Sequence, residues 1–256
     1  MIKKHLITCS VILVLAIIFK LNICSTETTK TTVKNTTNTH HVSRYIYAVN
    51  DAANEYSFAD EAIPQNDEKV NRKMRVIMKK HDYHNIQSNI LQLKADRWFP
   101  IIEPILKQFG IPNDFKYLPL VESGLKEGTS PKGAAGLWQF MPGTARTYGL
   151  KVGKGKDERM NIRKSTIAAC KYIKELHDEF HNWTLTAAAY NNGSIKLAKA
   201  MRAQKKVNYF RMHLNSETGN YVYNLIAMKE IIDRPGKYGY PPVYAYEPLS
   251  QMLAYN

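Results

Sequence analysis

Residues 113–125, NDFKYLPLVESGL, are the stretch that decides the fold. Asn113 or Asp114 can cap a helix here, because their side chains accept hydrogen bonds from the free N–H groups of a first turn. The apolar residues that follow have helical spacing, and Gly124 ends the helix because glycine readily adopts a left-handed conformation. Glu122 is therefore predicted on the last turn of a short helix, beside an apolar wall.

Outside this stretch, apolar residues again recur at helical spacing. The pattern predicts helices over residues 95–109, 161–180, 184–191, 194–203 and 217–232. Residues 124–136 have the Gly, Ser and Pro content of a loop, and a short helical piece is expected to resume at Leu137. Order is expected from about Val70, and strand patterns are scarce. The predicted fold class is mainly α, with little β structure.

The N-terminus has the pattern of an export segment. Two lysines precede an apolar run from Ile7 to Phe19, and Lys20 follows it. A membrane-spanning helix needs about 20 apolar residues, so residues 1–24 are interpreted as a signal peptide or an N-terminal membrane or lipid anchor. The sequence before Cys24 resembles a bacterial lipobox, although Ile23 replaces the usual small residue. Cleavage, lipidation at Cys24 and membrane anchoring all stay open.

The rest of the chain divides by composition. Residues 25–68 begin with a polar stretch that cannot build a core, and they are predicted to be a tether with an irregular lead-in. Residues 69–240 are predicted to form one folded domain, followed by a C-terminal tail over 241–256. This organisation indicates an exported protein, located in the periplasm or the cell envelope.

The formal net charge of +14 indicates an anionic partner. Export and the lack of a recognisable motif argue against nucleic acid. A cell-wall polymer, a membrane surface and a merely soluble basic face are the readings that remain.

Glu122 has the setting of a general acid. A carboxylic acid can protonate a leaving group near neutral pH only if its surroundings raise its pKa. Apolar neighbours remove water from Glu122, and the negative end of the helix dipole also disfavours the ionised form. A glutamate at a helix end is most often a surface residue, so the neighbouring motifs have to decide its role.

Four motifs occur in a fixed order: Glu122–Leu125 (ESGL), Gly136–Ala145 (GLWQFMPGTA), Ala188–Gly193 (AAYNNG) and Glu217–Val222 (ETGNYV). Together they resemble the family 1 lytic transglycosylases, whose catalytic part is called the SLT domain. The membrane-bound lytic murein transglycosylase D subgroup is the most similar branch. The resemblance covers roughly residues 70–233 and implies a lysozyme-like, mainly helical domain.

The resemblance implies that the protein cleaves the MurNAc–GlcNAc β-1,4 bond of peptidoglycan and leaves a 1,6-anhydroMurNAc end. Glu122 would be the single catalytic acid and base. Glycoside hydrolases normally show a second carboxylate across the bond, and none is evident near Glu122 in the sequence. The remaining acids weighed for that role have more ordinary positions at a helix start or on a solvated face: Asp157, Glu158, Glu175 and Asp178.

The resemblance also implies six substrate-binding residues: Ser123, Gln139, Met141, Tyr190, Asn191 and Tyr221. Ser123 would bind the acetamido group, and Gln139 and Met141 would line the cleft beside the muramic ring. Tyr190 would hydrogen-bond Glu122. The last two would contact the sugar site, although buried Asn and Tyr residues can equally be satisfied structural groups.

No cofactor and no metal site are expected. His177 and His181 have the i, i+4 spacing of zinc ligands, but no third ligand is implied. The expected partner is the peptidoglycan glycan strand, and the sequence identifies no partner in cell-wall remodelling. Two alternatives stay open: a hydrolytic muramidase or chitinase on the same fold, and a non-catalytic wall-binding protein.

Overall fold

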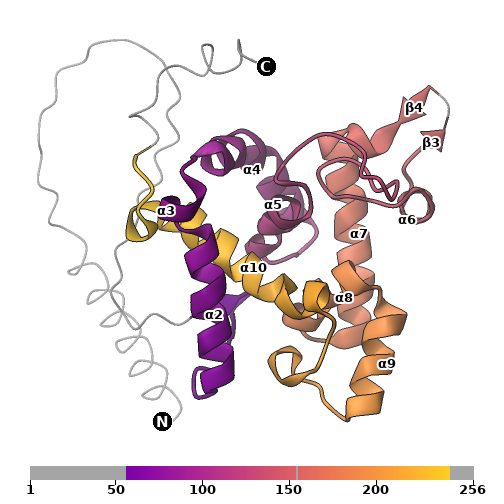
Figure 1. Cartoon of the computed structure of the whole chain (residues 1–256). Coiled ribbons are helices and arrows are strands. Elements are labelled where there is room, and N and C mark those ends of the chain that lie inside the picture. Colours follow the sequence, from indigo (N-terminus) through magenta and orange to yellow (C-terminus); the bar gives the residue numbers. More distant parts are fainter. Residues whose placement is uncertain (1–55, 154, 243–256) are drawn as a thin grey trace, which may run out of the picture. The chain divides into compact units, whose positions relative to one another are not determined.

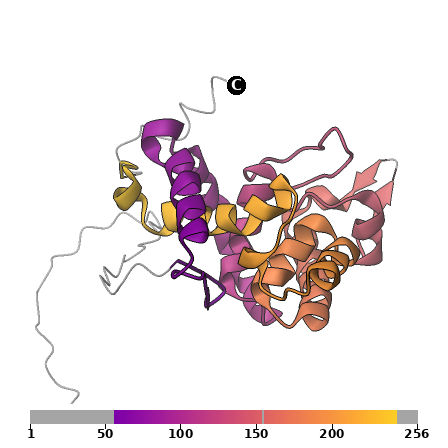
Figure 2. The ribbon, with the colours of Figure 1, turned by 60° about the horizontal axis from the view of Figure 1, so that its bottom comes forward.

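The computed structural model describes residues 56–153 and 155–242 (Figure 1). The predicted export segment, most of the tether and most of the C-terminal tail lie outside these residues. Within the described part, α10 runs through the middle and packs against α2, α5 and α8 (Figures 1 and 2). The α-helices are α2 (Glu68–His81), α3 (Tyr83–Ile86), α4 (Ile90–Gln108), α5 (Leu118–Ser123), α6 (Pro142–Thr147), α7 (Ile162–Phe180), α8 (Trp183–Asn192), α9 (Ser194–Gln204) and α10 (Ser216–Asp233).

The remaining elements are short. Two antiparallel pairs of strands and four 3-10 helices complete the described chain: β1 (Ser57–Phe58), β2 (Glu61–Ala62), β3 (Val152–Gly153), β4 (Lys156–Asp157), η1 (Asn113–Tyr117), η2 (Glu158–Met160), η3 (Tyr209–Arg211) and η4 (Pro235–Tyr238). The predicted mainly helical fold class is confirmed. No helix among the described residues is long and apolar enough to cross a membrane.

The hairpin of β1 and β2 begins the packed structure earlier than the sequence predicted. Phe58 and Ile63 are buried in the core, although order was expected only from about Val70. The Glu61 carboxylate accepts hydrogen bonds of 2.7 and 2.8 Å from the backbone N–H groups of Trp183 and Thr184, at the start of α8. This long-range cap ties the hairpin to the domain, and no local pattern in the sequence indicates it.

The stretch that decides the fold divides into η1 and α5. Pro119 has no N–H to donate and so disfavours a helix interior, and α5 starts with Pro119 in its first turn. Gly124 ends α5 with φ 59°, as predicted. Glu122 therefore lies on the last turn of α5, which packs against α10.

The expected helix at Leu137 is wrong. Residues 136–139 form a turn that is closed by the bridge of Ala135 to Phe140, and a second bridge of Ala135 to Thr129 closes the loop before it. Gln139 has φ 47°, which a continuing helix does not allow. The helix begins instead at Pro142, a residue suited to a first helical position.

The predicted helices in the second half of the chain are confirmed within a few residues. Asn161, Asn182 and Asn215 cap α7, α8 and α10, and each side chain accepts a hydrogen bond from a backbone N–H group of the first turn. Ten residues of α10 are buried, from Thr218 to Ile231. More than half of this helix is thus inside the domain, and α10 positions Tyr221 against Glu122.

Candidate active site

Glu122 is half-buried at the end of α5, and Tyr221 of α10 holds its side chain. The Tyr221 hydroxyl donates a hydrogen bond of 2.5 Å to Oε1 of Glu122. Burial raises the pKa of Glu122 to about 7, the Tyr221 hydrogen bond lowers it, and the nearby charge of Glu217 raises it. A carboxyl group with this pKa can hold a proton and release it near neutral pH.

Tyr190 does not make the predicted hydrogen bond to Glu122. Its hydroxyl donates instead to the backbone carbonyl of Trp138, at 2.9 Å. A tyrosine has one O–H proton, so this bond uses the one that Glu122 would have received. Tyr190 still lies near the carboxylate, since burial and then the charge of Glu122 raise its pKa. The donor to Glu122 is Tyr221, for which the sequence predicted either a contact with the sugar site or a structural role.

Ser123 joins the end of α5 to the turn that follows the loop. Its hydroxyl lies 3.0 Å from the carbonyl of Pro119 and 3.1 Å from that of Leu137. Both partners are backbone acceptors, so the hydroxyl proton is engaged with the protein. The predicted contact between Ser123 and an acetamido group stays a prediction.

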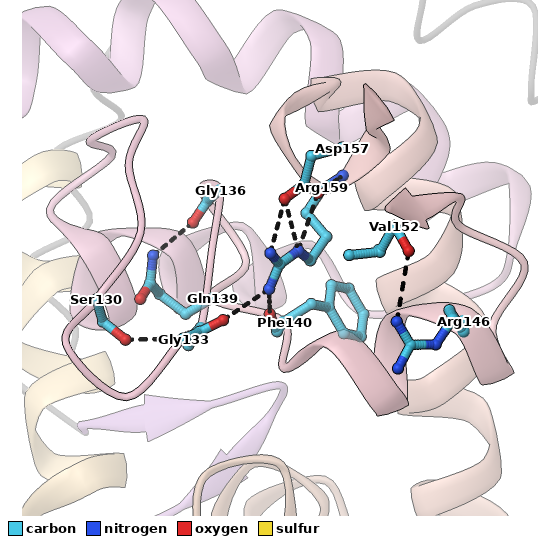
Figure 3. Close-up of polar contacts among 10 residues, drawn as sticks. Ser130, Gly133, Gly136, Gln139, Phe140, Arg146, Val152, Asp157 and Arg159 are labelled. Atoms are coloured by element: carbon cyan, nitrogen blue, oxygen red, sulfur yellow. Dashed lines mark hydrogen bonds and ion pairs between the residues drawn. The ribbon is translucent and has the colours of Figure 1, made fainter. Parts of the chain in front are cut away.

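Gln139 and Met141 lie on the turn beyond the loop. The Gln139 side chain donates a hydrogen bond of 2.8 Å to the carbonyl of Gly136 (Figure 3). Gly136 has φ 74°, and a Cβ atom there would lie 2.0 Å from the carbonyl oxygen of Arg159, so no other residue fits. Met141 is 46% exposed, a large fraction for an apolar side chain, which leaves it available to a ligand.

Arg159 holds this turn, a role that the sequence did not predict. Its guanidinium is buried and donates to the carbonyls of Gly133 and Phe140 at 2.7 and 2.8 Å (Figure 3). It also forms an ion pair of 2.7 Å with Asp157. The planar, always charged guanidinium can serve several acceptors at once, which suits it to fix a loop of irregular backbone. In the sequence, the only local indication of this role is the charged triplet Asp157–Arg159 (DER), which lies before the cap of α7.

Asn191 connects α8 to α10 beside Glu217. Its amide nitrogen donates to the Glu217 carboxylate at 3.2 Å, and its oxygen accepts from the Thr218 hydroxyl at 3.0 Å. Glu217 is exposed, and its charge raises the pKa of Glu122. The sequence analysis assigned it no role, although it is the first residue of the fourth motif. Among the residues that the structure describes, it is the one carboxylate that affects the pKa of Glu122.

The other acids weighed as second carboxylates have structural positions. Asp157 pairs with Arg159, and Glu158 pairs with Lys164 at 2.6 Å. Glu175 and Asp178 are exposed on α7. Across the described ranges, no group of three or more His, Cys, Asp or Glu side chains could hold a metal ion.

The site is thus a single carboxyl group of raised pKa, held by a tyrosine at the junction of two helices, as in enzymes that use general acid catalysis. The chain matches the family described as Transglycosylase SLT domain over residues 100–212. It is 32% identical over 183 residues to the membrane-bound lytic murein transglycosylase D of Escherichia coli, which is 69% of this chain and 39% of that relative. Residues 100–212 therefore carry the SLT domain, and the chain is similar to the lytic transglycosylases.

Two further similarities are more distant. A protein of Alteromonas named as a putative tributyltin chloride resistance protein is 28% identical over 110 residues, 42% of this chain and 53% of that protein. The crystal structure of the 70 kDa soluble lytic transglycosylase of Escherichia coli covers 66% of this chain and 30% of its own, with 19% identity and a TM-score of 0.45. This chain spans about two fifths of the transglycosylase D relative.

Proposed function

We propose that this protein is a peptidoglycan lytic transglycosylase that cleaves the MurNAc–GlcNAc β-1,4 bond and leaves a 1,6-anhydroMurNAc end. The observation that carries the proposal is Glu122, a half-buried carboxyl group whose pKa is raised to about 7 by burial. Its hydrogen-bond donor is a neutral tyrosine, so the carboxyl group can be protonated near neutral pH.

One residue can serve both proton transfers. Glu122 donates its proton to the glycosidic oxygen while the bond from that oxygen to C1 of the muramic residue breaks. The resulting carboxylate then accepts the proton of the muramic 6-hydroxyl as its oxygen bonds to C1. The substrate's own 2-acetamido carbonyl stabilises the positive charge that develops at C1, so neither water nor a second carboxylate takes part.

Tyr221 suits both halves of this cycle. Its hydroxyl bonds the Glu122 oxygen and stabilises the carboxylate that forms after proton donation. Glu217 acts in the opposite direction, since its charge favours the protonated form. The two neighbours thus act in opposite directions on the pKa of the catalytic group.

The substrate-binding assignments remain proposals. Met141 and Gln139 border the site as a partly exposed pair on one turn, which fits contacts with a sugar ring. Ser123, Tyr190 and Asn191 each have a protein partner, so we propose that they shape the site and meet the sugar through their remaining acceptor capacity.

We also propose a location in the cell envelope. The relative's name states that it is membrane-bound, and residues 1–24 of this chain have an export pattern. On this view residues 1–24 target or anchor the chain, and the segment up to Tyr56 spaces the catalytic domain from the membrane. The proposed catalytic domain is 69–240, with the β1–β2 hairpin added to it, and 241–256 form a tail.

A hydrolytic muramidase remains the second candidate, because Glu217 is a carboxylate close enough to change the pKa of Glu122. Mass spectrometry of fragments from purified peptidoglycan separates the two reactions, since an anhydro end is one water lighter than a hydrolysed end. We expect anhydro ends from the wild type and from Glu217→Gln alike. Hydrolysed ends that disappear in Glu217→Gln would contradict the proposal and make Glu217 the base of a hydrolase.

A further inference from the structure

A basic hollow of about 480 Å³ lies between α2 and the first turns of α10. Four of its lining residues carry positive charge. We use the name basic hollow for the surface formed by Lys69, Arg72, Lys73, Val76, Lys80 and Asn220. The proposed reaction uses none of these residues.

The charge of the basic hollow is uncompensated within the part of the chain that the structure describes. None of its four cations forms an ion pair there, whereas Arg75, elsewhere on α2, pairs with Glu68 at 2.9 Å. Asp67, the acid just before α2, accepts hydrogen bonds from the backbone N–H groups of Lys69 and Val70 as the cap of this helix. An anionic ligand would therefore meet cations that have no carboxylate of their own.

One cation is fixed, and the others are accessible. Lys73 donates a hydrogen bond of 2.6 Å to the carbonyl of Gly219, and its ammonium lies 4.8 Å from the centre of the Tyr223 ring. Burial lowers the pKa of this lysine. Lys69, Arg72 and Lys80 are exposed, and Val76, 51% exposed, adds an apolar wall. This combination suits a ligand that has both carboxylates and apolar side chains.

The basic hollow adjoins the active site through α10. Asn220, which lines the hollow, is three residues after Glu217 and directly precedes Tyr221. Residues three apart are neighbours on a helix surface, so Asn220 and Glu217 lie side by side. A substrate bound near Glu217 could therefore extend along α10 into the hollow.

We infer that the basic hollow binds the carboxylates of the peptide chains attached to the glycan substrate. This inference rests on the proposed function. Peptidoglycan peptides branch from the muramic residue and have free carboxylates and small apolar side chains, which match the cations and Val76. A peptide chain is narrow enough to enter a concave surface next to the reacting sugar. A membrane is flat and would instead contact a convex part of the protein surface.

The test compares two substrates and three double variants of the full chain. The substrates are glycan strands with their peptides and the same strands after an amidase has removed the peptides. The variant is Arg72→Glu/Lys80→Glu, and the control is Lys107→Glu/Lys174→Glu, which changes the net charge equally at exposed sites on α4 and α7. In the variant Arg72→Glu/Lys80→Glu, two exposed ion pairs between the protein and the peptide carboxylates are lost. The rate on peptide-bearing strands, divided by the rate on peptide-free strands, should therefore fall about tenfold.

The neutral variant Arg72→Gln/Lys80→Gln should give an intermediate ratio, and thermal melting verifies that each variant folds. Cosedimentation of Glu122→Gln proteins with the same strands measures binding without turnover. If the wild type proves inactive, the proposed function is refuted, but the cosedimentation still tests whether the basic hollow binds the peptides. An unchanged ratio and unchanged binding would overturn the inference. So would a loss of binding to phosphatidylglycerol vesicles with no change on peptide-bearing strands, because the surface would then be a membrane contact.

Discussion

Glu122 and Glu158 are the same amino acid in two regions of one domain, and their surroundings act in opposite directions. Glu122 has an apolar environment and one neutral donor, and burial raises its pKa to about 7. Glu158 is less than a tenth exposed, yet Lys164 at 2.6 Å, the backbone N–H of Lys151 at 2.8 Å and Lys156 at 3.5 Å lower its pKa to about 2. Burial without a cationic partner keeps the proton on Glu122, whereas the cationic and N–H partners of Glu158 favour its ionised form.

The two regions also have different roles in the domain: the region around Glu158 is structural, and the region around Glu122 is the proposed catalytic site. The paired carboxylates Asp157 and Glu158 lie beside Arg159, which holds the turn of Gln139. That region is fixed by ion pairs, while Glu122 forms no ion pair with any residue in the described part of the chain. A protein gains stability from the first arrangement and reactivity from the second.

The largest expected effect comes from removing the ionisable group of Glu122. Glu122→Gln keeps the shape but can neither donate nor accept the proton, so turnover of peptidoglycan should fall at least about 10³-fold. The matched control is Glu158→Gln, which makes the same chemical change where the carboxylate is structural. It should retain turnover in the folded protein and lower the free energy of unfolding. Near wild-type turnover in Glu122→Gln would show that Glu122 is not the catalytic acid, and the contrast between Glu122 and Glu158 would then have no functional meaning.

Arg159 tests the structural side of the comparison. Arg159→Met leaves the Asp157 carboxylate and two backbone carbonyls without their buried donor, and the free energy of unfolding in urea should fall by about 3–5 kcal/mol. Arg146 is an exposed arginine on α6 with one bond of 3.4 Å to the carbonyl of Val152. Arg146→Met should change stability by less than about 0.5 kcal/mol. Equal losses in the two variants would show that Arg159 does not hold the loop.

Glu122 should also make the folded protein less stable as the pH rises. The free side chain titrates near 4.5 and the folded one near 7, so ionisation favours the unfolded chain between these values. Glu122→Gln should therefore gain up to about 3 kcal/mol of stability at pH 8 and nothing below pH 4.5. Urea unfolding of both proteins at several pH values measures this difference. A constant difference across pH would contradict the raised pKa.

The smallest expected effect concerns the tyrosine that acts on Glu122. Tyr221→Phe removes the hydrogen bond that lowers the pKa of Glu122, so the fall of activity at high pH should move to higher pH. Turnover should also drop about tenfold, because the carboxylate loses its donor. Tyr190→Phe removes a bond to the Trp138 carbonyl and should leave the position of the high-pH fall unchanged. If the high-pH fall of activity moves in Tyr190→Phe and not in Tyr221→Phe, then Tyr190 is the donor to Glu122, as the sequence predicted.

Much of the fold could be predicted because local patterns determine it. Helical spacing located α7, α8 and α10, and Gly124 located the end of α5. The helix expected at Leu137 was wrong because a left-handed Gln139 and the bridges of Ala135 are set by tertiary contacts. The early hairpin was missed for a similar reason, since Glu61 acts on a helix far along the chain.

The site was predictable in its catalytic residue and less so in its partners. Glu122 could be found because its position follows from a helix end and an apolar run. Which tyrosine reaches it depends on the relative placement of α8 and α10, and spacing along the chain does not determine that placement. Arg159 and Glu217 were missed because their roles depend on backbone carbonyls and on a neighbouring helix.

Carbon-13 NMR of the side-chain carboxyl groups in one sample tests the central claim most directly, with the two resonances assigned by their loss in Glu122→Gln and Glu158→Gln. The account predicts that Glu122 titrates near pH 7 and that Glu158 stays ionised down to about pH 2. Titration of Glu122 at or below pH 4.5 would contradict the account, because the residue would then be ionised at neutral pH and could not act as the acid.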